Sequence, residues 1–378
     1  MRKLLIRFIH VLARLHQWMA IIVIVNELGS LESLDEGTLG RLQYAFLMVG
    51  RRRSTRIWYA RLLRRDRRSC VPIQFWLALT ALHLGRVRLA ALLYRRISAR
   101  DDISSEANAA KTLAAIMDLV TSKQIFARIE AFVDKLMLGQ GESILLVPVG
   151  SNFSELFWLW LEQARKHVGS RIVGVTLDQA AASLVGHALE GNVLDLSSFF
   201  VFTDAGTMHP HSKKMLWLLR VLLLREIVGR GHTVTSMDLD ALVLGDVGAM
   251  LSTFPKADIV AQQDYSAPVD VARKQGFILC CGFMIFCPTP ATRQFLNRYA
   301  ERTMLELDDQ LALNHLIAEA GVSAKTIESH YFSFQAGGVR WLCPDRTLVS
   351  RDIAYGKVIR HFQQTEQTIA ELRGLCGI

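Results

Sequence analysis

Two patterns of hydrophobic and polar positions divide the chain near residue 139. Before that point apolar residues recur at helical spacing, as they do from Leu4 to Trp18. After the Gly139–Glu142 segment, short continuous apolar runs alternate with amphipathic stretches. We therefore predict an all-α domain over residues 1–138 and an α/β domain over residues 139–378.

One helical hairpin is legible in the N-terminal part. Two apolar stretches, 75–84 and 87–96, flank Gly85, and small residues alternate with large ones along both. This resembles a tetratricopeptide helix pair weakly, because no second copy follows at a fixed period.

The α/β part alternates predicted strands with predicted helices. The strands are predicted at 144–149, 172–177, 198–202 and 232–237, and the helices at 151–168 and 215–228. This order predicts a mostly parallel sheet covered by helices, of the Rossmann-like kind. Ligands of such sheets bind at the carboxyl ends of the strands. A turn between two further strands is predicted at Gly337 and Gly338.

Composition narrows the class of protein. Apolar residues make up 51% of the 378 residues and charged residues 21%, so the chain is not of the disordered class. The six cysteines show neither a CxxC motif nor zinc-site spacing, and the adjacent Cys280 and Cys281 favour a buried strand. A reducing compartment is the expectation from this pattern.

The net charge of +9 comes from the N-terminal part alone. Nine arginines lie between Arg51 and Arg68, and they either form the solvated face of two helices or bind an anionic membrane surface. The first apolar run is too short for a spanning helix, which needs about 20 residues. We expect a cytoplasmic protein with no nucleic-acid partner, and peripheral membrane contact if this region binds anionic lipid rather than forming a solvated face.

Two carboxylates, Asp238 and Asp240, follow the fourth predicted strand. Carboxylates this close repel unless a cation lies between them, and their oxygens suit Mg²⁺ or Mn²⁺. Such a cation can in turn hold a diphosphate. The alternative is that one aspartate caps a following helix, since Asp-x-Asp also arises by chance.

The segment from Arg220 to Asp240 resembles the nucleotide-diphospho-sugar transferase family, glycosyltransferases of the GT-A fold. Members carry a basic helix residue, a glycine and then a strand that ends in Asp-x-Asp. The resemblance spans about residues 142–372, and further segments agree with it in order: Ser151–Trp160, Asp178, Cys281–Phe286, Asp308–Gln310 with Asn314, and His361.

The resemblance implies a metal-dependent glycosyltransferase of the GT-A fold. It would move a hexosyl or pentosyl unit from a nucleotide-diphosphate sugar, a UDP-sugar above all, to a glycan, protein or lipid acceptor. The implied cofactor is Mn²⁺ or Mg²⁺, with Asp238, Asp240 and His361 as ligands. An ordinary surface histidine is the alternative for His361.

The resemblance also implies which residues meet the substrates. Asn152, Arg220, Asp238 and Gly282 would contact the donor nucleotide and its phosphates. Structural alternatives are a solvated helix arginine for Arg220 and a turn or cap residue for Asn152.

The catalytic set implied in the same way is Asp238, Asp240, Asp309 and Gln310. Asp309 and Gln310 would line the sugar or acceptor pocket. The alternative for Asp309 is a charge that complements the start of a helix.

Three departures from the family pattern keep other functions open. Cys280 and Cys281 stand before Gly282, where the family usually has a polar residue. Val247 follows Asp246 at a position where the family often has a proline. The segment after His361 has no lysine of the kind that binds phosphate in related enzymes. A catalytically inactive sugar-nucleotide fold that acts as an adaptor through its helical domain is one alternative. A nucleotidyltransferase is another, although the loop after the first predicted strand lacks the basic residues that it would need.

Overall fold

A computed structural model describes residues 71–83, 87–99, 123–136, 142–199, 210–239, 241–243, 256–264, 268–329, 331–344 and 359–361, with a few isolated helical positions besides. Two compact units divide the chain, residues 1–125 and residues 126–378. The predicted boundary after residue 138 stays a prediction.

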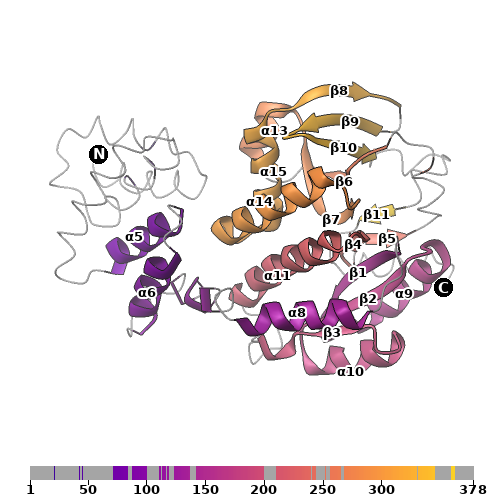
Figure 1. The fold of residues 1–378 in the computed structure, drawn as a ribbon, viewed down its shortest axis with the longest axis horizontal. Coiled ribbons are helices and arrows are strands. Elements are labelled where there is room, and N and C mark those ends of the chain that lie inside the picture. The colour runs from indigo at the N-terminus through magenta and orange to yellow at the C-terminus, as the bar shows by residue number, and fades with distance from the viewer. Residues whose placement is uncertain are drawn as a thin grey trace. The chain divides into compact units, whose positions relative to one another are not determined.

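In the first unit, helices α5 (Val71–His83) and α6 (Val87–Ser98) pack against each other, as the hairpin pattern predicts (Figure 1). Small buried residues, among them Ala78 and Ala90, let the two helices approach closely around the buried Tyr94. The arginine-rich segment and the first apolar run lie outside the described residues. Within the described part of the chain, no helix is both long and apolar enough to cross a membrane.

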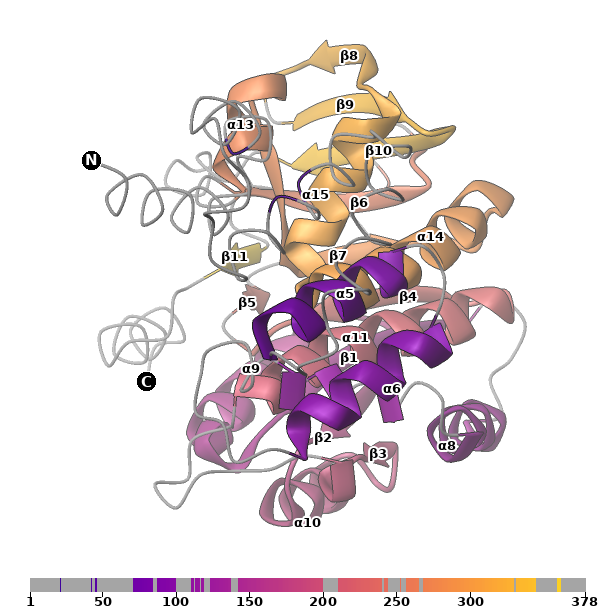
Figure 2. The same cartoon turned by 90° about the vertical axis from the view of Figure 1, so that its left-hand side faces the viewer.

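The second unit is built on a nine-stranded sheet, with the strands in the order β3-β2-β1-β4-β7-β6-β10-β9-β8. Figure 2 shows β3 and β8 at its opposite ends. The strands of the first half are β1 (Ser143–Val149), β2 (Arg171–Thr176), β3 (Val193–Asp195) and β4 (Thr233–Met237). They pair in parallel. Their carboxyl ends therefore meet at one edge, as the sequence predicts.

The other half of the sheet is mixed. Its strands are β6 (Ile259–Asp264), β7 (Ile278–Phe286), β8 (Ser323–Ile327), β9 (Tyr331–Ala336) and β10 (Val339–Pro344). Strand β7 is antiparallel to both β4 and β6, so β6 runs in the same direction as β4. Strand β10 pairs with β6 in parallel, and β9 is antiparallel to both β10 and β8. The predicted mostly parallel sheet is thus confirmed in its strand directions, with β7 and β9 as the antiparallel strands among those described.

Helices cover both faces of the sheet. On one face, α9 (Ser154–His167) and α10 (Gln179–Ala188) bury an apolar cluster that includes Val147 of β1 and Trp160 of α9. The tight packing of α10 depends on Gly174 of β2, where a Cβ would lie 2.5 Å from Cγ1 of Val185.

The opposite face carries the helices that lead to the candidate site. Helix α8 (Lys123–Lys135) and helix α11 (Pro210–Gly229) line one apolar pocket over β1 and β2. Helices α14 (Pro290–Glu306) and α15 (Asp309–Ala320) follow β7, and α14 packs against α11. Helix α13 (Val269–Gln275) links β6 to β7.

Two local predictions have different outcomes. The strand predicted at 198–202 is wrong at its start, because the third strand is Val193–Asp195 and Ser197–Phe199 forms a 3-10 turn instead. Residues 200–202 lie outside the described part of the chain. There Asp195 accepts a hydrogen bond from the amide of Ser197, which turns the chain before its aromatic residues. The predicted glycine turn is confirmed, since Gly337 and Gly338 join β9 to β10 with positive φ angles of 58° and 80°.

Candidate active site

The loops after β1 and β2 are held together by one carboxylate. Asp178 begins α10, where its Oδ1 accepts a hydrogen bond from the Ala181 amide at 2.8 Å. Its Oδ2 accepts another from the Ser151 amide, also at 2.8 Å. The backbone of Asn152 lies in the 3-10 turn that follows, Ser151–Phe153, and its side chain is outside the described part. Two neighbouring loops at the carboxyl edge of the sheet are therefore fixed to each other.

Strand β4 ends beside an irregularity in β7. The pairing of β6 with β7 shifts between Ala261 and Gln262, so that three residues of β7, Cys281–Phe283, have no partner in β6. Within this β7 bulge the carbonyl of Gly282 accepts a hydrogen bond from the Asp238 amide at 2.9 Å. Bulges bend a strand and often occur beside active sites. Gly282 thus approaches the end of β4 through its backbone.

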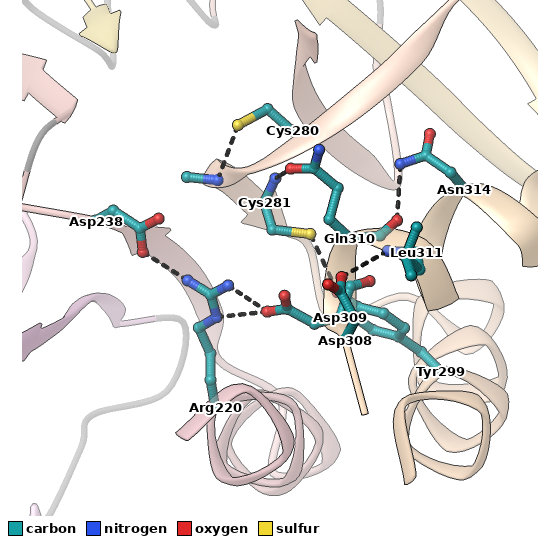
Figure 3. Close-up of polar contacts among 11 residues, drawn as sticks. Arg220, Asp238, Cys280, Cys281, Tyr299, Asp308, Asp309, Gln310, Leu311 and Asn314 are labelled. Carbon is teal, nitrogen blue, oxygen red and sulfur yellow. Dashed lines mark hydrogen bonds and ion pairs between the residues drawn. The ribbon is translucent and has the colours of Figure 1, made fainter. Parts of the chain in front are cut away.

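Arg220 of α11 lies between two carboxylates (Figure 3). Its Nη1 donates to Oδ1 of Asp238 at 2.6 Å, and its Nε donates to Oδ2 of Asp309 at 2.9 Å. The arginine and Asp309 side chains are almost fully buried, whereas 35% of the Asp238 side chain is exposed. The alternative of a solvated helix arginine is wrong. The expected contact of Arg220 with phosphates stays a prediction, since the guanidinium is bound to carboxylates here.

Burial and charge set the protonation of this group. The Arg220 pKa is raised well above its ordinary value, because the nearby Asp309 and Asp238 outweigh the opposing effect of burial. Burial raises the pKa of the Asp309 carboxyl, although Arg220 counteracts it. Arg220 therefore stays a cation and Asp309 depends on it as a counter-ion.

The first turn of α15 is anchored at several points. Asp308 caps the helix by accepting a hydrogen bond from the Leu311 amide at 2.9 Å. Asn314 binds both backbone groups of Leu279 in β7, accepting from its amide at 2.7 Å and donating to its carbonyl at 2.8 Å. Gln310 accepts a long hydrogen bond of 3.5 Å from the Cys281 amide. These contacts fix α15 against β7 and with it Asp309.

Tyr299 of α14 is a site residue for which the sequence carries no recognisable signal. Its hydroxyl donates to the backbone carbonyl of Asp309 at 3.1 Å and lies 3.3 Å from Sγ of Cys281. Burial raises the pKa of both the Tyr299 hydroxyl and the Cys281 thiol well above their ordinary values. Both groups are thus neutral. They contact each other, and Tyr299 holds the backbone of Asp309 through its hydrogen bond.

The predicted metal ligands are only partly described. Asp238 lies at the end of β4, whereas Asp240 and the side chain of His361 are outside the described residues. The backbone of His361 belongs to β11 (Ile359–His361), which pairs antiparallel with β5 (Ala241–Val243). His361 is paired with Ala241, the residue after Asp240. Among the described side chains no group of three or more potential ligands comes together, so the metal site stays a prediction.

His315 of α15 and Arg302 of α14 belong to a cluster of charged side chains. His315 Nδ1 is 2.7 Å from Oε2 of Glu306, and its Nε2 is 3.8 Å from Oδ2 of Asp270 in α13. Arg302 pairs with both Glu306 and Glu319. Burial opposes protonation of His315, but the adjacent Glu306 and Asp270 raise its pKa overall. The same contact with His315 lowers the pKa of Glu306 against the effect of burial.

A known protein family matches part of the chain in sequence. Residues 167–349 match the model of the nucleotide-diphospho-sugar transferase family. The matched range holds Arg220, Asp238, Gly282, Asp309 and Gln310, so the resemblance read from the sequence is confirmed. No curated protein matches the chain in sequence.

Several solved structures are similar in part. The galactosyltransferase LgtC, solved with donor and acceptor sugar analogues, is 12% identical, with a TM-score of 0.37 over 62% of this chain and 95% of that one. The bifunctional glycosyltransferase WbbM is 16% identical, with a TM-score of 0.32, and the similarity covers 47% of this chain but only 37% of WbbM. Mouse xyloside xylosyltransferase 1 is 10% identical, with a TM-score of 0.32 over 48% of this chain and 82% of that one.

Proposed function

We propose, on the premise that residues 167–349 carry the nucleotide-diphospho-sugar transferase pattern, that the chain transfers a sugar from a nucleotide diphosphate to an acceptor. Transfer breaks the anomeric carbon–oxygen bond, and negative charge grows on the departing diphosphate. The carboxyl edge of the parallel strands, where Asp178 and Asp238 lie, is where a ligand of such a sheet binds.

The proposal includes a divalent metal ion, Mn²⁺ or Mg²⁺, bound at the end of β4. The observation that carries this part is the pairing of His361 with Ala241, which brings the backbone of a potential imidazole ligand beside the residue that follows Asp240 in the chain. Asp238, Asp240 and His361 would hold the ion, and their oxygen and nitrogen atoms suit Mn²⁺. When bound, the ion supplies positive charge next to the leaving diphosphate.

The remaining residues orient the carboxylates. Arg220 holds Oδ1 of Asp238 at 2.6 Å and binds Asp309 through Nε, so both side chains have fixed directions. Asp309 and Gln310, anchored by Asn314 and Tyr299, would line the sugar or acceptor pocket. Preorganised groups of this kind act without reorganising during the reaction.

Release of nucleotide from a panel of UDP- and GDP-sugars with MnCl₂ tests the proposal. We expect release by the wild-type protein, and a loss of about 100-fold or more in Asp240→Asn, because one side of the metal site is removed. Binding of Mn²⁺ to the two proteins, followed by electron paramagnetic resonance, gives a readout that does not depend on turnover.

Asp134→Asn is the matched control, since it makes the same chemical change at an exposed carboxylate that pairs with Arg230. It is expected to keep wild-type release and Mn²⁺ binding. Retention of release in Asp240→Asn would contradict the metal site. Failure of the wild-type protein to bind any sugar nucleotide would contradict the transferase assignment as a whole.

A further inference from the structure

Gln262 carries a buried polar atom that has no partner. The residue is only 4% exposed, and among the described residues its Oε1 is one of the buried side-chain atoms without a hydrogen bond. An unsatisfied buried acceptor costs about 1–3 kcal/mol. Such atoms are rare in native proteins, and each calls for a reason.

Gln262 lies on a strand that ends at the same edge of the sheet as the candidate active site. Strand β6 runs in the same direction as β4, so the two strands end at the same edge of the sheet. Gln262 pairs with Cys280, at the point where the β7 bulge opens. Within the bulge, Gly282 binds the amide of Asp238. Residues 280–282 of β7 therefore contact Gln262 of β6 at one end and the backbone of Asp238 at the other.

We propose that Oε1 of Gln262 accepts a hydrogen bond from a hydroxyl group of the sugar attached to the nucleotide diphosphate. The proposal rests on the proposed function and adds a residue that discriminates among donor sugars. A sugar hydroxyl is a neutral donor, which is what an amide oxygen needs. The diphosphate offers only acceptor oxygens, so it does not fit this atom.

The neighbours of Gln262 in the bulge do not supply the missing donor. Sγ of Cys280 accepts a hydrogen bond from the Gly282 amide at 3.3 Å, and a thiol is at best a weak donor. A site built to bind a substrate hydroxyl rejects analogues that lack it, because its own polar group is then left unpaired. Gln262 thus gives the pocket a means of selection that its cysteines lack.

Calorimetric binding of UDP, UDP-glucose and UDP-galactose to Gln262→Met, with MnCl₂ present, tests the proposal. Methionine has similar length and no amide, and its thioether sulfur is only a weak acceptor. We expect unchanged affinity for UDP and an about tenfold loss of affinity for the UDP-sugar that wild type prefers, equivalent to one hydrogen bond. We also expect a higher melting temperature, because a buried unsatisfied atom is gone. A residue with a purely structural role would lower it.

Gln263→Met is the matched control, because it makes the same change one residue along β6, where the side chain points to the opposite face of the sheet. It should leave the ratio of UDP-sugar to UDP affinity unchanged. Equal loss of UDP and UDP-sugar binding in Gln262→Met, no loss, or a loss accompanied by a lower melting temperature would overturn the proposal. If wild type binds none of these ligands or their GDP counterparts, the proposed function fails instead.

Discussion

The two halves of the sheet differ in the kind of contact that dominates them: apolar packing in one and a buried polar network in the other. In the parallel half, from β3 to β4, strands bury apolar residues on both faces, and polar groups such as Asp178 act at the loops. In the mixed half, β7 and α15 carry a buried polar network around Asp309, Gln310 and Asn314. The parallel half therefore builds the framework, while the mixed half fixes the groups that would contact the sugar.

The largest effect is expected where the network holds a buried charge. Asp309→Ala leaves Arg220 buried with Asp238 as its remaining carboxylate partner, among the described residues. Removing one partner of a buried ion pair typically costs about 3–5 kcal/mol. Urea unfolding measures the loss, with Asp134→Ala, an exposed ion-pair partner, as the control that should change little. A loss below about 1 kcal/mol would mean that the mixed half does not depend on this pair.

A packing change tests the parallel half. In Gly174→Ala the new Cβ would lie 2.5 Å from Cγ1 of Val185 and 3.2 Å from Cδ1 of Leu189. We expect a loss of about 1–3 kcal/mol by overpacking, measured by thermal and urea unfolding.

Gly186→Ala in α10 provides the comparison, because no atom lies within 4 Å of its added Cβ. This variant should be neutral or more stable, by about 0.5–1 kcal/mol, since alanine favours a helix. Equal destabilisation by the two alanines would contradict the assignment of the loss in Gly174→Ala to overpacking against α10.

A smaller effect is expected at the loop carboxylate. Asp178→Ala removes the cap of α10 and the bond to the Ser151 amide. We expect about 1–2 kcal/mol lower stability and weaker UDP binding, because the two loops are no longer joined. Titration calorimetry with UDP checks this, and unchanged UDP affinity would place the nucleotide away from these loops.

The smallest effect is a dependence of stability on pH through His315. Its folded-state pKa is raised, so its contribution is complete below the ordinary imidazole value and is lost as pH rises through the raised one. The lowered pKa of Glu306 works in the other direction, and its contribution is lost as pH falls through that value. Urea midpoints measured across both ranges should fall at each end, and His315→Gln should remove the decline at high pH. An unaltered profile in that variant would contradict the assignment.

The sequence predicts the parallel half better than the mixed half for a physical reason. Strand Ser143–Val149 is buried on both faces, so it appears as a continuous apolar run that ends before Gly150. The error at 198–202 arose because two adjacent phenylalanines resemble a strand, whereas the true third strand has only three residues.

Residues of the candidate site were partly predictable. Asp238, Asp309 and Gln310 follow from the family resemblance, and the structure brings Asp238 and Asp309 onto the same arginine. The partnership of Arg220 with Asp309 spans 89 positions, and no local periodicity reports such a contact. Tyr299 and Gln262 depend in the same way on how strands and helices meet, so the sequence alone does not single them out.

The β7 bulge also limits how the candidate site can evolve. Side chains of a strand alternate between faces, so a single deletion within Cys281–Phe283 would reverse the orientation of one flank against its neighbours. Indels of one residue there would carry Cys280 or Met284 to the wrong side of the sheet. Natural variants should therefore change the specificity of the candidate site by substituting side chains at constant length. An insertion or deletion at this point would indicate a chain in which the site is no longer functional.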